Sequence, residues 1–214
     1  MMELTEARTR GYRRFAGILA MAAFLPMLTG CARLFGWDIH APGILSQNFY
    51  QQIQPVSDRV ALYLPPRLTE YISQDKGTRF SDPQTYHVGE AVTPLLIEGF
   101  QQAFGEFVSL ETEPEPAVLQ QYGIPYLVVV DLKSFRNLKT YKAQALVLET
   151  DVGIYDRNMN LLARFDAKGT SDAQKVFAKK GGPEVNMNAA LENNVLVIIQ
   201  FVQDYIASHR ANPA

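Results

Sequence analysis

Histidine is the residue type best suited to bind a metal ion or move a proton near neutral pH, and this 214-residue chain has three of them. His40 and His209 lie in segments without a sustained pattern, whereas His87 comes directly before an amphipathic segment. His87 and Glu90 are three residues apart, a spacing that can hold a metal ion on a helix. Gly89 argues against a helix there and no third ligand is near in the sequence. We therefore expect a polar lead-in to a helix and no metal site.

Two groups of carboxylates could also carry chemistry. Glu111, Glu113 and Glu115 could suggest calcium, but prolines lie among them and no loop of alternating aspartates is present. We expect a solvated turn there. Glu149 and Asp151 point to one side of a strand, and paired carboxylates can carry out acid–base catalysis. On a half-exposed strand such a pair is more typical of a solvent-facing surface, which is the interpretation that we favour.

Motifs of known catalytic sites are absent from the sequence. It contains no G-x-S-x-G, no phosphate-binding loop, no G-x-G-x-x-G and no H-E-x-x-H. Lys179 and Lys180 belong to a loop with glycine and proline, where they would solubilise the loop; a contact with anionic envelope material is the alternative. We expect no catalytic residues, no cofactor and no enzymatic activity.

The N-terminus has the pattern of a secretion signal. Four arginines between Arg8 and Arg14 precede an apolar run from Phe15 to Leu28. The run holds about fourteen residues, whereas a transmembrane helix needs about 20. Basic residues, a short apolar core and small residues at its end are typical of a secretory signal. We expect residues 1–30 to be a signal peptide.

The apolar run ends in Leu28-Thr29-Gly30-Cys31, which resembles the lipobox of bacterial lipoproteins. The resemblance implies cleavage between Gly30 and Cys31 and diacylation of the Cys31 thiol, often with a further acyl chain on the new amino group. Two or three chains would anchor the protein stably, whereas one anchors only marginally. A buried free cysteine is the alternative role. Lipoproteins kept at the inner membrane typically carry Asp after the anchor, but this chain has Ala32, so we expect the outer membrane, facing the periplasm.

The composition is that of an ordinary globular domain, with 47% hydrophobic and 20% charged residues. The net charge of −2 includes the arginines of the signal, so the mature chain is more acidic and shows no basic face for nucleic acid. Cys31 is the single cysteine, so no intramolecular disulfide can form. The expected partners are the membrane, through the lipid anchor, and envelope proteins, but not nucleic acid; the sequence leaves an oligomer open.

The chain after the signal divides into a tether, one domain and a tail. Residues 31–57 form the lipidated N-terminus and a tether, because they have no sustained period and contain scattered glycines, prolines and glutamines. Their aromatic residues could lie at the membrane interface or pack on the domain. We expect a periplasmic domain over residues 58–208 and a tail over 209–214.

Two kinds of periodicity predict the elements of the domain. Alternation and β-branched content predict strands near 60–64, 108–111, 126–132, 146–154 and 161–168, with a hairpin turn at 156–160. The continuous apolar run at 126–132 indicates a strand buried on both faces. Helical spacing predicts helices from near residue 88 to 107 and from 188 to 208, and allows a short one near 68–72. Pro94 lies inside the first helical pattern, so that helix either kinks or begins at Thr93; we favour Thr93 as N-cap and Pro94 at the first helical position.

The order of elements predicts a two-layer α/β sandwich, with both helices on one face of a mixed sheet. The last helix should pack its apolar stripe, Leu191, Val195, Ile198 and Val202, on that sheet. The order over residues 58–208 resembles small periplasmic lipoprotein domains related to the N-terminal domain of TolB, the curli secretion lipoprotein CsgG and the YajG-type lipoproteins. We do not find the pair of membrane-inserting hairpins that CsgG-like proteins carry.

Three functions remain open at this point. The leading one is a non-catalytic, lipid-anchored accessory protein of an envelope transport, assembly or motility complex. The second is a binding module for a lipid, glycan or peptide, which an apolar pocket with a few polar groups would favour. The third is an envelope hydrolase, which requires a cleft with a placed nucleophile or perturbed acids.

Overall fold

The computed structural model describes residues 36–77, 82–139, 143–172, 174–175 and 182–211. The chain divides into two units. The smaller unit includes residues 36–37, 76–77 and 82–84 of the described chain, and in it the backbone N–H of Trp37 donates to the carbonyl of Pro83 at 2.9 Å. The larger unit, residues 38–75 and 85–214, contains the sheet, the long helices and the core. The predicted signal peptide, Cys31 and Lys179–Lys180 lie outside the described residues.

The larger unit is built on one mixed sheet. Its strands are β2 (Val56–Tyr63), β5 (Phe104–Leu110), β6 (Tyr126–Lys139), β7 (Ala143–Tyr155) and β8 (Leu161–Thr170), in the spatial order β5-β2-β6-β7-β8, with β9 (Gln174–Lys175) paired to β7. β2 runs parallel to both β5 and β6, whereas β6, β7 and β8 are antiparallel. All the predicted strands are present, and the predicted α/β fold class is confirmed.

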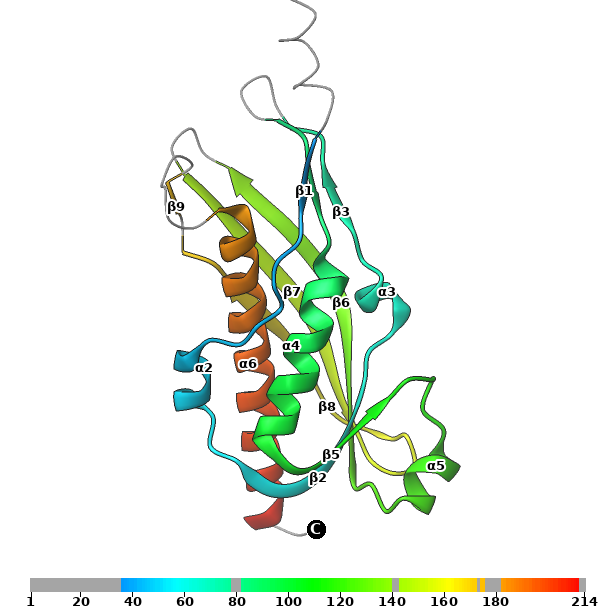
Figure 1. Ribbon diagram of the computed structural model, residues 1–214. Coiled ribbons are helices and arrows are strands. Elements are labelled where there is room, and N and C mark those ends of the chain that lie inside the picture. The colour runs from blue at the N-terminus through cyan, green and yellow to red at the C-terminus, as the bar shows by residue number, and fades with distance from the viewer. Residues whose placement is uncertain (1–35, 78–81, 140–142, 173, 176–181, 212–214) are drawn as a thin grey trace, which may run out of the picture. The chain divides into compact units, whose positions relative to one another are not determined.

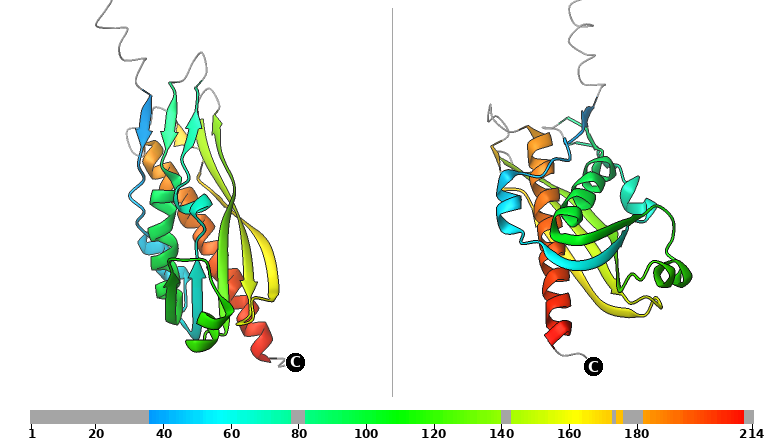
Figure 2. Two further views of the ribbon diagram at one scale, coloured as in Figure 1. Left: turned by 90° about the vertical axis from the view of Figure 1, so that its right-hand side faces the viewer. Right: turned by 60° about the horizontal axis from the view of Figure 1, so that its bottom comes forward.

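Two long helices, α4 (Val88–Ala103) and α6 (Pro183–Ala211), lie side by side on one face of the sheet (Figures 1 and 2). The predicted stripe of α6, Leu191, Val195, Ile198 and Val202, has no exposed surface. Its burial against the sheet and α4 is therefore confirmed. Among the described residues, no helix is long and apolar enough to cross a membrane.

The opposite face of the sheet is covered at one end by the short helix α5 (Pro116–Gln121). Leu119 of α5 packs with Ile124 on Ala61 of β2 and Leu127 of β6, and all four are buried. Val128 and Val130, which alternate with Leu127 along β6, belong to the core under the long helices. The start of the run, at Leu127 and Val128, is therefore buried on both faces as predicted, whereas the prediction is wrong at Asp131, whose side chain is 31% exposed on the outer face. Helix α5 was not predicted from the sequence.

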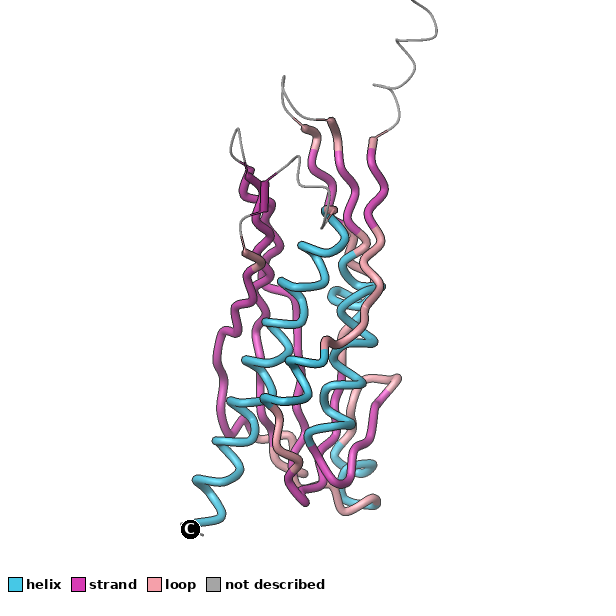
Figure 3. The backbone as a smooth tube through the Cα atoms, turned by 60° about the vertical axis from the view of Figure 1, so that its left-hand side comes forward, coloured by secondary structure: helices cyan, strands magenta, loops and turns pink. Residues whose placement is uncertain are grey.

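The segment predicted to be an irregular tether packs on the domain over residues 39–53. It contains helix α2 (Gln47–Gln52), whose N-cap Ser46 accepts a hydrogen bond from the backbone N–H of Phe49. Ile39, Leu45, Phe49 and Ile53 are buried in the main core. The expectation of a tether is wrong for these residues, because the apolar positions are spaced irregularly along a path that crosses α4 and α6. Figure 3 shows this path beside the two helices.

The prediction that α4 begins at Thr93 is wrong. α4 begins at Val88 and contains Pro94 in its interior. Two other hydrogen bonds stabilise the first turn. The hydroxyl of Thr93 donates to the carbonyl of Gly89 at 2.8 Å, and the backbone N–H of Gly89 donates to the backbone carbonyl of Tyr71 at 3.0 Å. Burial of Val88, Ala91 and Val92 stabilises this turn against the cost of the proline.

Position 89 of the helix requires a glycine because a neighbouring segment leaves no room for a side chain. A Cβ atom at this position would lie 2.2 Å from the carbonyl oxygen of Thr69, at the end of α3 (Pro66–Thr69). The argument from Gly89 against a helix was therefore wrong, since the glycine allows a close approach. Three short strands complete the fold: β1 (Trp37–Ile39), β3 (Ser73–Asp75) and β4 (Gln84–Tyr86), in the order β1-β4-β3.

Candidate functional site

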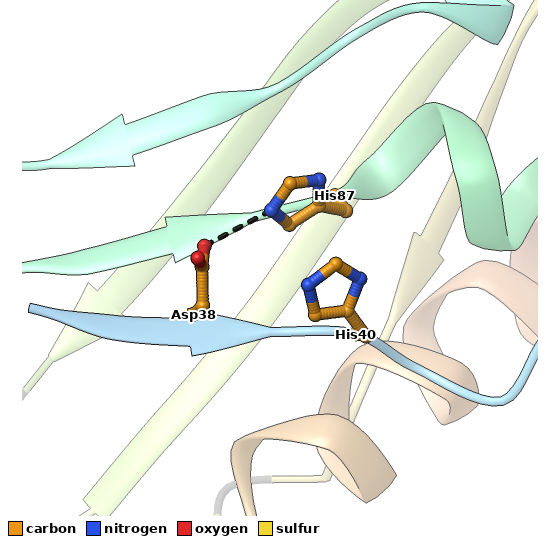
Figure 4. Close-up of side chains that lie close together, drawn as sticks. All are labelled: Asp38, His40 and His87. Carbon is orange, nitrogen blue, oxygen red and sulfur yellow. Dashed lines mark hydrogen bonds and ion pairs between the residues drawn. The ribbon is translucent and has the colours of Figure 1, made fainter.

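Two histidines stack on each other where β1 ends and α4 begins. His40 follows β1 and His87 directly precedes α4. Their ring centroids are 3.9 Å apart and their planes differ by 15°. The two side chains therefore share one site although they come from distant parts of the sequence (Figure 4).

The backbone of the two short strands explains this meeting. The N–H of His87 donates to the carbonyl of Ile39 at 3.1 Å, which ties the two segments together. Ile39 is fully buried, and successive side chains of an extended segment point to opposite sides. Asp38 and His40, which flank Ile39, are therefore both directed away from the core and toward solvent.

Two carboxylates lie at opposite nitrogens of the stacked rings. Asp38 Oδ1 is 3.0 Å from Nε2 of His87. Glu90 Oε2 is 3.0 Å from Nδ1 of His40 and 3.8 Å from Nδ1 of His87. Glu90 is in the first turn of α4, where a negative charge is favourable. The cluster of Asp38, His40, His87 and Glu90, which we call the His–acid cluster, is open to water on one side: the His87 side chain is 22% exposed and Asp38 68%.

The His–acid cluster contains a set of potential metal ligands. One ligand atom each from Asp38, His40 and His87 lie within 4.8 Å of one another. Two imidazoles and a carboxylate are ligands that zinc and related transition metals accept. His87 and Glu90 were recognised in the sequence as potential ligands, whereas Asp38 and His40 were not. Its expectation of no metal site relied on the lack of a third ligand, which the fold supplies. The sequence Asp38-Ile39-His40 contained a signal for these two ligands. An Asp and a His flank one apolar residue, and on an extended strand both would lie on the same side.

The outer face of the sheet carries a second group of charges, formed by β6, β7 and β8. Asp151 of β7 accepts two hydrogen bonds from the guanidinium of Arg164 on β8. The bond from Nε measures 2.8 Å, and the second comes from a terminal nitrogen. Glu149 accepts from the Ser134 hydroxyl at 2.9 Å and from Arg136 at 2.6 Å.

Further ion pairs lie around an open depression of about 500 Å³ on this face. Lys133 pairs with Asp166, and Arg67 of α3 lies 3.4 Å from Asp131. The depression is lined by Arg67, Asp131, Lys133, Asp151, Arg164 and Asp166, together with Leu132 and Phe165. Its walls are mostly charged, which differs from the apolar walls of a typical small-molecule pocket.

These contacts decide the protonation of the two carboxylates that could have acted as an acid–base pair. The hydrogen bond from Ser134 and the charge of Arg136 hold the pKa of Glu149 below its usual value. The hydrogen bonds and charge of Arg164 likewise lower the pKa of Asp151. Both groups are therefore ionised at neutral pH, whereas a general acid needs a raised pKa.

The remaining candidate residues lie apart from both groups. Glu111, Glu113 and Glu115 are exposed in the turn before α5, and the described residues gather no set of three metal ligands there. His209 is near the end of α6, stacked on Tyr205 with ring centroids 4.0 Å apart. It is far from the His–acid cluster in the fold, because β1 and the start of α4 lie at the opposite end of the helix layer (Figure 1).

Comparisons with known proteins give structural neighbours only. No protein-family model matches the sequence, and no curated protein matches it. Among solved structures, the hypothetical protein CT253 from Chlamydia trachomatis is 8% identical with a TM-score of 0.47, over 72% of this chain and 99% of its own. A minor lipoprotein from Acinetobacter baumannii is 15% identical with a TM-score of 0.38, over 73% of this chain and 96% of its own. Lipoprotein GNA1162 from Neisseria meningitidis is 8% identical with a TM-score of 0.33, over 72% of this chain and 99% of its own.

The structural neighbours thus include bacterial lipoproteins at low sequence identity. With identities of 8–15% and TM-scores of 0.33–0.47, they assign neither a family nor a function to this chain.

Proposed function

We propose that this protein is a lipid-anchored accessory component of the bacterial envelope that acts by binding other envelope proteins and not by catalysis. The observation that carries the proposal is the sequence Leu28-Thr29-Gly30-Cys31 at the end of a basic and apolar signal. Acylation of Cys31 would hold the domain at a membrane surface, since two or three acyl chains give stable anchoring.

The chemistry of the outer sheet face supports a role without catalysis. Glu149 and Asp151 are the paired carboxylates nearest in kind to a hydrolase site, and both are engaged by arginines with a lowered pKa. Neither can keep a proton for a leaving group at neutral pH. The third function considered from the sequence, an envelope hydrolase, therefore finds no support at this pair.

The same face supports a role in polar recognition. Lys133, Asp166 and Arg164 alternate in sign across β6 and β8, and each is about half exposed or more. Surfaces of mixed charge favour selective and salt-sensitive association with a surface of complementary pattern. The process that we propose is transport, assembly or motility, each of which uses accessory proteins at the membrane surface.

We place the protein on the outer membrane, facing the periplasm. The support is Ala32 after the anchor, where an Asp would keep a lipoprotein of the enterobacterial type at the inner membrane. Density-gradient fractionation of the host envelope tests this, and co-migration with inner-membrane markers contradicts it. Ala32→Asp should move the protein to the inner-membrane fractions.

The anchor is tested by Cys31→Ser in the full chain. We expect the variant to lose incorporation of a labelled fatty acid and to retain its signal peptide, whereas wild type is labelled and shortened. Undiminished label on Cys31→Ser contradicts the anchor.

The binding role is tested by purification from detergent-solubilised envelopes: a protein partner that is retained at low salt and released at high salt supports it. Recovery of a lipid, glycan or peptide in place of a protein would support a binding module.

A further inference from the structure

We propose that the His–acid cluster binds one divalent transition-metal ion of the zinc class, with Asp38, His40 and His87 as ligands and Glu90 as a positioning residue. This site is independent of the lipid anchor and of any protein partner. It would join β1 and the residue that follows it to the start of α4.

The arrangement of the nitrogens carries the assignment. Glu90 lies on the Nδ1 side of both imidazoles, 3.0 Å from Nδ1 of His40 and 3.8 Å from Nδ1 of His87. Asp38 lies on the Nε2 side of His87, at 3.0 Å. In Figure 4 each ring also turns one nitrogen toward the Asp38 carboxylate. A metal ion on this side would meet two imidazole nitrogens and one carboxylate oxygen.

Glu90 has the position of an outer carboxylate in a zinc site. Histidines that bind a metal through one ring nitrogen usually donate the other N–H to a carboxylate or carbonyl, which fixes the tautomer and the ring orientation. Glu90 accepts from Nδ1 of His40 at 3.0 Å and so favours, for that ring, the tautomer with a free lone pair on Nε2. The rings stack nearly parallel, at 15°, and both have Nδ1 on the Glu90 side, so both Nε2 atoms lie on the Asp38 side (Figure 4).

The chemistry of the ligand set selects the class of metal. Magnesium and calcium prefer carboxylate, carbonyl and water oxygens, whereas imidazole suits zinc, copper, nickel and iron. The three ligand atoms lie within 4.8 Å of one another, and tetrahedral zinc ligands at about 2.0–2.2 Å from the ion are separated by about 3.3 Å. Small rotations of exposed side chains would close this difference. Three protein ligands leave a fourth position for water.

An arrangement of ion pairs without a metal is the alternative explanation. Exposed pairs between histidine and carboxylate contribute little, because water and salt screen them. The two explanations differ in one measurable property, which is saturable binding of zinc that depends on both histidines.

The experiment uses the full chain, purified in detergent without an oligohistidine tag. Zinc binding is measured by isothermal titration calorimetry, and Co²⁺ is used as a spectroscopic substitute. We expect saturation at one ion per chain, visible d–d absorption bands for bound Co²⁺, and a melting temperature that rises with zinc because the ion binds the folded state. Absence of saturable binding overturns the proposal.

Variants then locate the site. Glu90→Gln should weaken zinc binding about 10- to 100-fold, as expected for an outer carboxylate. His40→Gln and His87→Gln should each weaken it further and remove the rise in melting temperature. His209→Gln is the matched control, since it deletes the third histidine of the chain and should bind zinc as wild type does. If His87→Gln fails to fold, Asp38→Asn at the exposed ligand replaces it, with the same expected loss. Binding that survives both His40→Gln and His87→Gln, or that His209→Gln abolishes, overturns the proposal.

Discussion

Thr150 and Asn194 form a hydrogen bond inside the apolar interface between β7 and α6. The hydroxyl of Thr150 donates to the side-chain oxygen of Asn194 at 3.1 Å, and neither residue is exposed. The amide nitrogen of Asn194 faces the carbonyl oxygen of Leu148 at 3.5 Å. A shift of the helix along the sheet would leave these groups buried without partners, which costs free energy. The pair therefore favours one register of α6 on the sheet.

Replacing both members of this pair should destabilise the protein by less than the sum of the two single replacements. Thr150→Val leaves the oxygen of Asn194 buried without its donor, and we expect a loss of about 1–3 kcal/mol in the free energy of unfolding. Asn194→Leu should cost a similar amount by leaving the hydroxyl unpaired. The double variant should cost less than the sum, because two apolar groups leave no unpaired polar atom. Urea unfolding of the four proteins measures the difference; strictly additive costs would show that the hydrogen bond does not couple the two residues.

The buried stripe of α6 should contribute a large share of stability. Ile198 has no exposed surface, so Ile198→Ala should lower the free energy of unfolding by about 2–5 kcal/mol once the cavity is included. Val197→Ala is the matched control, because the neighbouring Val197 is 38% exposed. We expect it to change stability by about 0.5 kcal/mol or less. If Ile198→Ala melts like wild type while it loses a protein partner, the stripe is an interface instead of core.

Local periodicity was enough to predict the central part of the fold. The strand containing Leu127–Val130 follows from a continuous apolar run, and the strands around the Asp156 turn follow from a repeat of two. β6 and β7 both extend further than predicted. The turn itself is stabilised locally: the Asp156 carboxylate accepts from the backbone N–H groups of Asn158 and Asn160, both at 2.8 Å. The helix stripe containing Ile198 follows from a repeat of 3.6. In each case the residues that signal the element are also those that make its contacts.

The missed features depend on contacts between segments that are distant in the sequence. Phe49 is buried because it meets Gly99 of α4 at the contact with α6, where a Cβ on Gly99 would lie 3.2 Å from the Phe49 ring. Pro94 stays inside α4 because surrounding burial offsets its lost hydrogen bond. The His–acid cluster has the same origin, since Asp38 and His40 reach His87 only through strand pairing. No pattern within one window of sequence contains these relationships.

Phe49 provides a test of whether residues 39–53 belong to the domain. It is fully buried and lies between the two long helices, so Phe49→Ala should lower the free energy of unfolding by about 3–5 kcal/mol. Gln51→Ala, at an exposed position of the same helix, is the control and should change stability by about 0.5 kcal/mol or less. Thermal melting of the full chain in detergent compares them. Identical melting of Phe49→Ala and wild type would indicate that residues 39–53 form a tether and not a part of the domain.

Asp151 should make stability depend on acid pH. Arg164 lowers the pKa of Asp151 in the folded state below the value of about 3.9 expected for an unfolded chain. A carboxylate with a depressed folded pKa stabilises the protein above the unfolded pKa, and the contribution disappears as pH falls through the folded pKa. Because Arg164 is 65% exposed, water screens the pair and we expect no more than about 1 kcal/mol. Wild type should therefore lose more stability than Asp151→Asn between pH 6 and about pH 2, because the contribution decreases once the pH falls below the unfolded pKa. Urea unfolding at the two pH values measures this loss. Asp204→Asn, at an exposed position, is the control. An equal loss for wild type and Asp151→Asn would show that the ion pair adds nothing to the stability of the sheet.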